Sequence, residues 1–301
     1  MRDAGSKVMK NPDGRRFSFI SALFLAALTV GPQAVGGLPQ RPEGQTAALP
    51  SFEEMETNLL SAVNKERASR NLPVLRSAPA LVRLARRHSE EMARLDVLSH
   101  ESASGKSFTE RLTDAVVTFA ANGENVARSG TYDAGRIHQS FMESPGHREN
   151  VLHPEFDEVG IGIVRGAGNT YYVTEDFIRS LVRVPDSEVR AAVLGVLNEA
   201  RARAGRPPVV EVGEIRRTAE VFVRNSAAGK ASPSIPSFFG PTLMRTVIAQ
   251  DLDRISAAIR VKGLERYGRA GIGVEFSRTR EYPGGAYFVC ALLVEDTEIR
   301  R

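Results

Sequence analysis

The sequence predicts an α+β fold that is built twice in one chain, and three observations support this. Apolar residues recur at helical spacing between residues 59 and 95. Two β-rich runs, residues 159–164 and 170–178, are joined by a glycine-containing segment and predict a hairpin. Segments of the first half then recur in the second half, which predicts two tandem copies. Helices followed by a hairpin are typical of α+β proteins.

Three helices are expected before the hairpin. The first should begin near residue 51 and stop before Leu72-Pro73, because proline disfavours helix in the residue that precedes it. The second covers residues 81–95, where one stripe is apolar. The third is expected to start at Thr131 or Asp133 and to run to Glu143, where a Pro-Gly pair would end it.

The repeat links the two halves of the chain. Residues 60–75 align with residues 194–210 if one residue is inserted before the second copy's proline, and residues 159–164 align with residues 270–274. The offset between copies falls from 134 to 111 residues, so about 23 residues are absent from the middle of the second copy. All five histidines lie in the first half. The second copy is therefore expected to be a degenerate scaffold without an imidazole site.

The N-terminal residues have the order of parts found in a secretory signal peptide. Five basic residues precede an uncharged apolar run, residues 17–30, which is too short for a comfortable membrane span. Residues 1–36 are expected to be a signal peptide and residues 37–50 a linker rich in Gly, Pro and Gln. An uncleaved leader that anchors the chain in a membrane is the alternative. The two folded parts are assigned to residues 51–180 and 185–296.

Charge and cysteine content restrict the class of protein. Residues 51–180 carry 15 basic and 19 acidic residues, whereas residues 181–301 carry 19 basic and 14 acidic residues. These opposite signs favour docking of the halves or an anionic envelope partner, and they also fit ordinary solvated surface. No nucleic-acid partner is expected. The lone Cys290 lies in an apolar run, so a buried thiol and no internal disulfide are predicted. Export without disulfides is typical of bacterial proteins.

Two histidines and two glutamates, His100, Glu124, Glu143 and His147, are the residues with the clearest chemical potential. Imidazole and carboxylate groups bind divalent cations, and they also act as general acids and bases. Spacing alone does not choose between those uses. The simplest alternative for each residue is a polar side chain at the protein surface that has no role in a site. Three of the four are expected in loops, where scaffolds present functional groups. Neither a serine nor a cysteine triad is supported.

Several short motifs occur in a fixed order along the first half. They are Asn64-Lys65-Glu66-Arg67, Leu72-Pro73-Val74-Leu75, His88-Ser89-Glu90-Glu91-Met92-Ala93, Ser99-His100, Gly123-Glu124-Asn125-Val126-Ala127, Ser144-Pro145-Gly146-His147-Arg148-Glu149-Asn150-Val151-Leu152 and Gly160-Ile161-Gly162. In their order and spacing these motifs resemble the CAP superfamily of SCP-like extracellular proteins, in its disulfide-free bacterial branch, over about residues 56–178. Phe141 stands where the family usually has tryptophan, which this chain lacks.

The resemblance implies an α-β-α sandwich whose central cleft is lined by His100, Glu124, Glu143 and His147. Such clefts are similar to divalent-metal sites. The implied metal is zinc, held by His100 and His147, with Glu124 as a further candidate ligand. Glu143 is the position at which bacterial relatives vary.

Two residues beside this tetrad are expected to support it. Asn125 adjoins Glu124 and is expected to hydrogen-bond its segment and orient it. His88 belongs to the apolar stripe of the second helix, so it is expected to be a core or cleft-edge residue.

Three functions of different classes follow from these observations. The first is a secreted, periplasmic or cell-envelope binding module whose cleft holds a divalent ion and a ligand such as a glycan or lipid. The second is a metal-dependent hydrolase that uses the same cleft. The third is a structural envelope protein in which the tetrad is a stabilising polar network. The absence of a recognisable transition-state stabiliser and the siteless second copy favour binding over catalysis.

Overall fold

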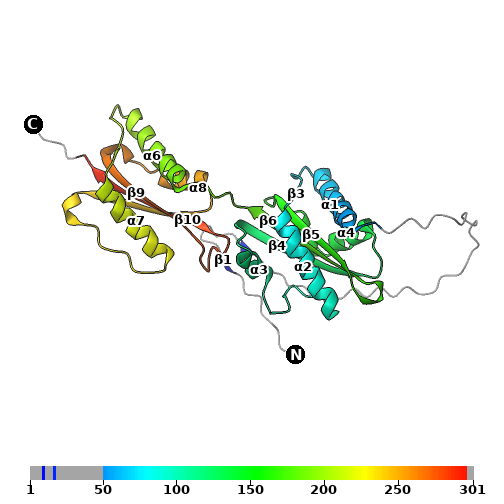
Figure 1. Ribbon diagram of the computed structural model, residues 1–301. Helices are drawn as coiled ribbons and strands as arrows, with labels where there is room; N and C mark the ends of the chain where they lie inside the picture. The colour runs from blue at the N-terminus through cyan, green and yellow to red at the C-terminus, as the bar shows by residue number, and fades with distance from the viewer. Residues whose placement is uncertain (1–8, 11–15, 18–49, 297–301) are drawn as a thin grey trace, which may run out of the picture.

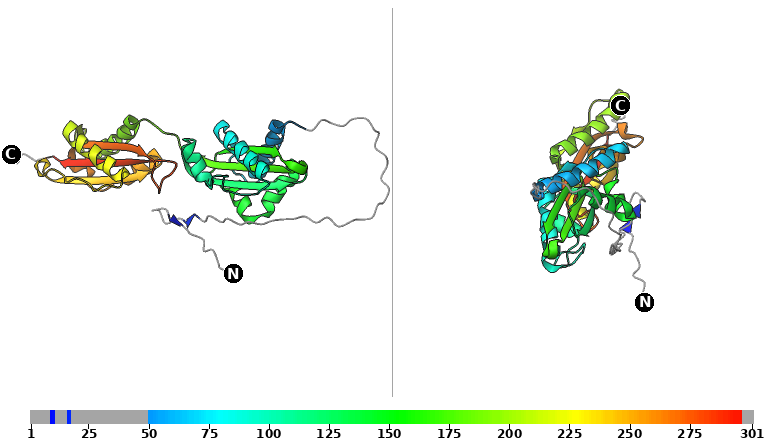
Figure 2. Two further views of the ribbon diagram at one scale, coloured as in Figure 1. Left: turned by 60° about the horizontal axis from the view of Figure 1, so that its bottom comes forward. Right: turned by 90° about the vertical axis from the view of Figure 1, so that its right-hand side faces the viewer.

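The computed structural model describes residues 9–10, 16–17 and 50–296. The expected signal peptide and linker fall almost entirely outside the described residues, apart from a short pair of strands, β1 (Met9–Lys10) and β2 (Arg16–Phe17). From residue 50 onward the chain forms two lobes that lie end to end (Figures 1 and 2). Within the described part of the chain, no helix combines the length and apolar character needed to cross a membrane.

The first lobe is a four-stranded sheet with helices on both faces. Its strand order is β3-β5-β6-β4; β3 is parallel to β5, and the other neighbours are antiparallel. The elements are α1 (Phe52–Ser69), β3 (Arg76–Ser77), α2 (Pro79–Leu95), α3 (Phe108–Asp114), β4 (Phe119–Ser129), α4 (Ala134–Glu143), α5 (Pro145–Val151), β5 (Glu158–Arg165), η1 (Ala167–Asn169) and β6 (Tyr171–Ser180).

The second lobe has a sheet with the same order and the same strand directions. Its order is β7-β9-β10-β8, with β7 parallel to β9 and the other neighbours antiparallel. The elements are α6 (Asp186–Arg203), β7 (Val210–Glu211), α7 (Gly213–Ala227), η2 (Ser237–Phe239), β8 (Thr242–Ala249), α8 (Leu252–Ile259), η3 (Leu264–Arg266), β9 (Tyr267–Ser277) and β10 (Ala286–Glu295).

Successive side chains of a strand point to opposite faces of the sheet. Each sheet therefore has two faces on which helices pack. In β6, Val173 and Phe177 belong to the core under α1, α4 and α5, whereas Tyr172 and Ile178 pack with α2 and α3. The second lobe divides in the same way, with α6 and α8 on one face of β10 and α7 on the other. The predicted mixed α+β class and the predicted hairpin, β5–β6, are confirmed.

The beginning of α5 corrects one expectation. The Pro-Gly pair after Glu143 does not open a loop, because Pro145 is the first residue of α5. A proline at that position loses no helical hydrogen bond and its fixed φ suits the helix. His147 therefore lies in a helix and Glu124 lies in β4, so the expectation that three tetrad residues occupy loops was wrong. Of the four, only His100 lies between elements.

Individual contacts recur in the two lobes at a constant offset. The amide of Leu75 donates to Oδ1 of Asn64 at 2.8 Å, and the amide of Val209 donates to Oδ1 of Asn198 at 2.8 Å. The offset of 134 thus persists beyond the proline, so the residue that the alignment inserted there is unnecessary.

Two buried arginines repeat this correspondence. Nε of Arg67 donates to the carbonyl of Pro73, and Nε of Arg201 donates to the carbonyl of Pro207. Both guanidinium groups are almost fully buried and satisfy the backbone of the turn that follows the first helix of their lobe.

The Gly-x-Gly segments of β5 and β9 allow a helix to lie directly on each sheet. A Cβ added at Gly160 would lie 2.1 Å from the carbonyl carbon of Leu81 in α2, and one added at Gly271 would lie 2.1 Å from the amide nitrogen of Arg216 in α7. These approaches are too close for any side chain. The glycines therefore set the distance between helix and sheet.

Candidate functional site

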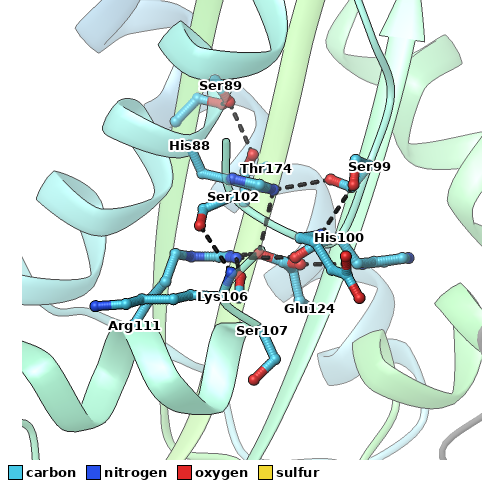
Figure 3. Close-up of polar contacts among 12 residues, drawn as sticks. His88, Ser89, Ser99, His100, Ser102, Lys106, Ser107, Arg111, Glu124 and Thr174 are labelled. Atoms are coloured by element: carbon cyan, nitrogen blue, oxygen red, sulfur yellow. Dashed lines mark hydrogen bonds and ion pairs between the residues drawn. The ribbon is translucent and has the colours of Figure 1, made fainter. Parts of the chain in front are cut away.

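Glu124 is the centre of a buried polar network at the edge of the first lobe's sheet (Figure 3). Its Oε1 lies 3.0 Å from Nδ1 of His100, and its Oε2 pairs with the guanidinium of Arg111. A carboxylate only accepts hydrogen bonds, so Nδ1 of His100 carries the proton in this pair. The lone pair of the neutral His100 ring is therefore on Nε2.

Arg111 comes from α3, a helix that the sequence analysis did not predict. Ser107 caps the helix in a capping box with Glu110, and Phe108 and Leu112 anchor it in the core. The buried Arg111 side chain also donates from a terminal nitrogen to the carbonyl oxygen of His100 at 2.8 Å. One guanidinium group thus holds both members of the histidine–carboxylate pair.

His88 lies behind this pair, on α2. It is 2% exposed, and its Nε2 lies 2.8 Å from the carbonyl oxygen of Ser99, to which it donates. The same nitrogen is 3.9 Å from Oε2 of Glu124. Burial lowers the pKa of His88, which favours the neutral ring. The structure places His88 in contact with the loop that carries His100.

Asn125 connects the network to α5. Its Nδ2 lies within hydrogen-bonding distance of the carbonyl oxygen of His147, at 3.2 Å, and of Oε2 of Glu175, at 3.0 Å. Its Oδ1 accepts from Nδ2 of Asn150 at 2.9 Å. Asn125 is completely buried, so it fixes the first turn of α5 against β4.

His147 lies on α5 with its ring edge against Phe141, at 5.3 Å between ring centres. Burial and the nearby His100 both lower the pKa of His147. His147 therefore lies within electrostatic range of His100, and its neutral form is favoured there. Phe141, at the position expected to hold a family tryptophan, packs directly beside the site.

Glu143 is the last residue of α4 and is exposed. Its hydrogen bond within the described residues is to Nε2 of Gln139 at 2.9 Å, one turn earlier on α4. The structure thus joins His100 to Glu124, places His147 near His100, and pairs Glu143 with Gln139.

Two buried carboxyl groups on β6 were not singled out from the sequence. Asp176 lies directly opposite Glu124 and Glu175 directly opposite Asn125 in the β4–β6 ladder, and both are completely buried. Burial raises the pKa of Glu175 to about 7. Burial and the neighbouring Glu124 raise the pKa of Asp176 well above its usual range. In the sequence, these groups were indicated only by the presence of two acidic residues inside an otherwise apolar strand.

The donor set limits the kind of metal ion that the site accommodates. Across residues 50–296, no three or more His, Cys, Asp or Glu side chains are grouped as metal ligands. Both Glu124 oxygens already have partners. Of the four tetrad residues, His100 and His147 are therefore the ones that would hold a metal ion, with Glu124 orienting His100 from behind.

Comparison with known proteins agrees with the motifs. Residues 60–177 match the family model described as "CAP: Cysteine-rich secretory protein family". Residues 60–177 of the first lobe are therefore similar to the CAP family. Two curated relatives from Bacillus subtilis, the uncharacterized protein YkwD and the uncharacterized membrane protein YlbC, are each 29% identical to the chain, over 133 and 124 residues.

These matches cover only parts of the proteins compared. The YkwD match covers 44% of this chain and 50% of the relative, and the YlbC match covers 41% and 34%. An extracellular SCP-domain protein from Bacillus anthracis is 28% identical, with 43% of this chain and 41% of the other covered and a TM-score of 0.40. A cysteine-rich secretory protein from Staphylococcus aureus is 22% identical, with 47% and 41% covered and a TM-score of 0.36. The chain thus spans half or less of these relatives' length.

Proposed function

We propose that this CAP-domain protein is an exported binding module of the extracellular space or cell envelope. In this proposal the cleft of the first lobe holds a divalent cation, zinc first, on His100 and His147 and presents it to an envelope ligand such as a glycan or lipid. Glu124 orients His100 and is not itself a ligand. Export agrees with the basic and apolar order of residues 1–36, and with the B. anthracis relative, which is described as extracellular.

The observation that carries the proposal is a comparison of matched positions in the two lobes. Gly160 lies against Leu81 and opposite Asp176, and Gly271 lies against Ile215 and opposite Leu292. These two glycines and their neighbours fix which residue of the second lobe corresponds to each residue of the first. Counted along the helices and strands from these positions, the buried polar groups of the first lobe correspond to apolar residues in the second. The matched pairs are His88 and Phe222, Ser89 and Val223, Glu124 and Met244, Thr174 and Cys290, and Asp176 and Leu292.

This replacement argues against a purely structural role for the network. The same sheet is packed in the second lobe with apolar side chains, including Phe222, Cys290 and Leu292. Burying charged groups costs desolvation free energy, and replacing a buried ion pair with apolar residues is often neutral or stabilising, by roughly 1–4 kcal/mol. A lobe that needed only stability would not require this network. We therefore assign it to binding.

We also infer that residues 185–296 are a degenerate second copy of the CAP architecture. The support is the common strand order and direction, the recurring contacts of Asn64 and Asn198, and the paired glycines of β5 and β9. In this copy the three-residue 3-10 helices η2 and η3 stand in the places of α3 and α5. Because α3 and α5 carry Arg111 and His147, the copy lacks the α-helices that build the site.

The hydrolase alternative has less support from the geometry. A metal-dependent hydrolase needs a carboxylate or other base beside the metal-bound water. Glu124 is committed to Arg111 and His100, and Glu143 is exposed and paired with Gln139. Neither glutamate is poised as a free base. A panel of ester, peptide and glycoside substrates offered to the zinc-loaded protein would reveal turnover if this alternative were correct.

Zinc titration calorimetry on the chain from residue 37 tests the proposal. The wild type is expected to bind one zinc ion with micromolar or tighter affinity, and His100→Ala/His147→Ala is expected to show no binding at that site. The pH should be above 7, because an ordinary imidazole, with a pKa of about 6.5, is largely neutral there. Equal binding by the wild type and the double variant, or no heat from either, would refute the metal-cleft proposal.

A further inference from the structure

We propose that Arg111 is the positioning residue of the cleft, which fixes the proton of His100 on Nδ1 and leaves Nε2 free to bind. This inference rests on the proposed function for its ligand, but the state of the His100 ring can be measured without any ligand. Arg111 belongs to none of the sequence motifs named above.

The first step is the geometry of the arginine. Its guanidinium contacts three separate groups: the carboxylate of Glu124, the carbonyl oxygen of His100 at 2.8 Å, and the carbonyl oxygen of Lys106 at 3.4 Å. The first contact holds the acceptor of the His100 ring, and the second holds the backbone that carries that ring. A change in either would rotate the imidazole relative to Glu124.

The second step is burial. The Arg111 side chain is 7% exposed and the Glu124 side chain 4% exposed, so water has little access to the contact between them. The planar guanidinium donates to Oε2 of Glu124 from one terminal nitrogen and to the carbonyl oxygen of His100 from the other. Oε1 of Glu124 is thereby held 3.0 Å from Nδ1 of His100, where a carboxylate oxygen accepts the Nδ1–H.

The third step separates positioning from folding. Phe108 and Leu112 already anchor α3 in the core beside Leu81 and Ile178, so the helix does not depend on a buried charge to be held. The second lobe has only the three-residue helix η2 in the place of α3 and still forms the same sheet. Arg111 is therefore dispensable for the architecture, although not for the state of His100.

The variants are Arg111→Met, which removes the charge and all donors, and Arg111→Lys, which keeps the charge. Lysine is a point donor without the planar fork, so it does not hold Glu124 and the His100 carbonyl together. Arg86→Met is the matched control. Arg86 also pairs with a buried glutamate of the same lobe, Glu56, at 2.5 Å, but that pair contains no histidine.

The first measurement is the ¹⁵N spectrum of the His100 imidazole in the metal-free full chain at pH 7.5. The wild type and Arg86→Met are expected to show Nδ1 protonated and Nε2 unprotonated. Arg111→Met and Arg111→Lys are expected to show a mixture of the two tautomers. If Arg111→Lys retains the wild-type spectrum, the proposal is wrong, whatever Arg111→Met shows. Arg111→Lys retains the charge balance of the site, so it decides the question even if Arg111→Met fails to fold.

The second measurement is zinc affinity by calorimetry, with the His100→Ala/His147→Ala variant alongside. Loss of a group that orients a ligand is expected to weaken zinc binding by about 10- to 100-fold in Arg111→Met, with no change in Arg86→Met. Unchanged affinity in both Arg111 variants, with binding abolished in the double variant, would refute the positioning role and leave the proposed function standing. Wild-type zinc binding by the double variant would refute the proposed function, and the ¹⁵N spectrum would still decide the role of Arg111.

Discussion

Replacement of Glu175 by glutamine should make the first lobe more stable at alkaline pH, because the structure buries this carboxyl group without a cation. Glu175 is fully buried, one oxygen faces Asn125, and the other has no hydrogen-bond partner within the described residues. Burial raises its pKa from 4.5 to about 7. At about 1.36 kcal/mol per pKa unit, that difference corresponds to about 3 kcal/mol.

The sign follows from proton binding in the two states. Between pH 4.5 and 7 the folded protein keeps the Glu175 proton, whereas the unfolded chain has released it. The free energy of unfolding therefore falls as the pH rises through this window, and the full cost is present above pH 7. Relative to Glu175→Gln, which cannot ionise, the wild type should lose about 2.5 kcal/mol between pH 5 and pH 8. The variant should be more stable than the wild type at pH 8.

Urea titrations at pH 5, 6.5 and 8 would measure this difference. The two lobes need not unfold together, so the probe should report on the first lobe alone. The proton NMR signals of the five histidines do so, because all of them lie in the first half of the chain. The neighbouring Asp176 faces the opposite side of the sheet and also has a raised pKa, so Asp176→Asn is the control for its contribution. Parallel stability curves for the wild type and Glu175→Gln across this range would refute the reasoning.

Three further predictions follow from single contacts. Asp176→Leu, which copies Leu292 of the second lobe, should raise the urea midpoint of the first lobe and weaken zinc binding; a lower midpoint would show that the carboxyl group stabilises the fold. Gly160→Ala should cost about 1–3 kcal/mol in urea titrations, because its Cβ would overlap the backbone of Leu81, and an unchanged midpoint would contradict that packing. Arg278→Ala should speed hydrogen exchange in α3, because Arg278 donates to the carbonyl of Val117 just after that helix; exchange equal to that of the wild type would show that the second lobe does not brace it.

The elements that could be predicted from the sequence were those with a local pattern. The apolar stripe predicted α2, and Asp133 does cap α4, accepting from the amide of Arg136 at 3.0 Å. The helix α3 was missed because seven residues are too few for a periodic signal. Its capping box, Ser107 with Glu110, was visible and was the one local indication. Pro145 was likewise misinterpreted, because a proline favours the first position of a helix as much as it ends a preceding one.

The candidate site could be predicted only as a set of residue types. The imidazole of His100 and the carboxylate of Glu124 are recognisable from the sequence as groups that bind or react. Their partner Arg111 lies 11 residues after His100 and 13 before Glu124, in a position that no apolar stripe or motif spacing marks. Cross-strand pairing, which sets Asp176 opposite Glu124, also depends on register that becomes known only when the sheet is formed. Sequence patterns identify groups that bind or react; the groups that hold them in place emerge from tertiary structure.

The second lobe provides a comparison that substitutions in the first lobe alone would not. Three features are absent from it together: every histidine, the helix that carries Arg111, and the buried polar network around Glu124. If the polar network stabilised the fold independently of the histidines, the second lobe could have kept the network after losing its histidines. Their joint absence is expected when the groups act as one unit, since a buried carboxylate without its arginine and imidazole partners only costs desolvation free energy. For the same reason, the effects of Arg111→Met and Glu124→Met on zinc affinity should be strongly non-additive, with the double variant no weaker than either single variant.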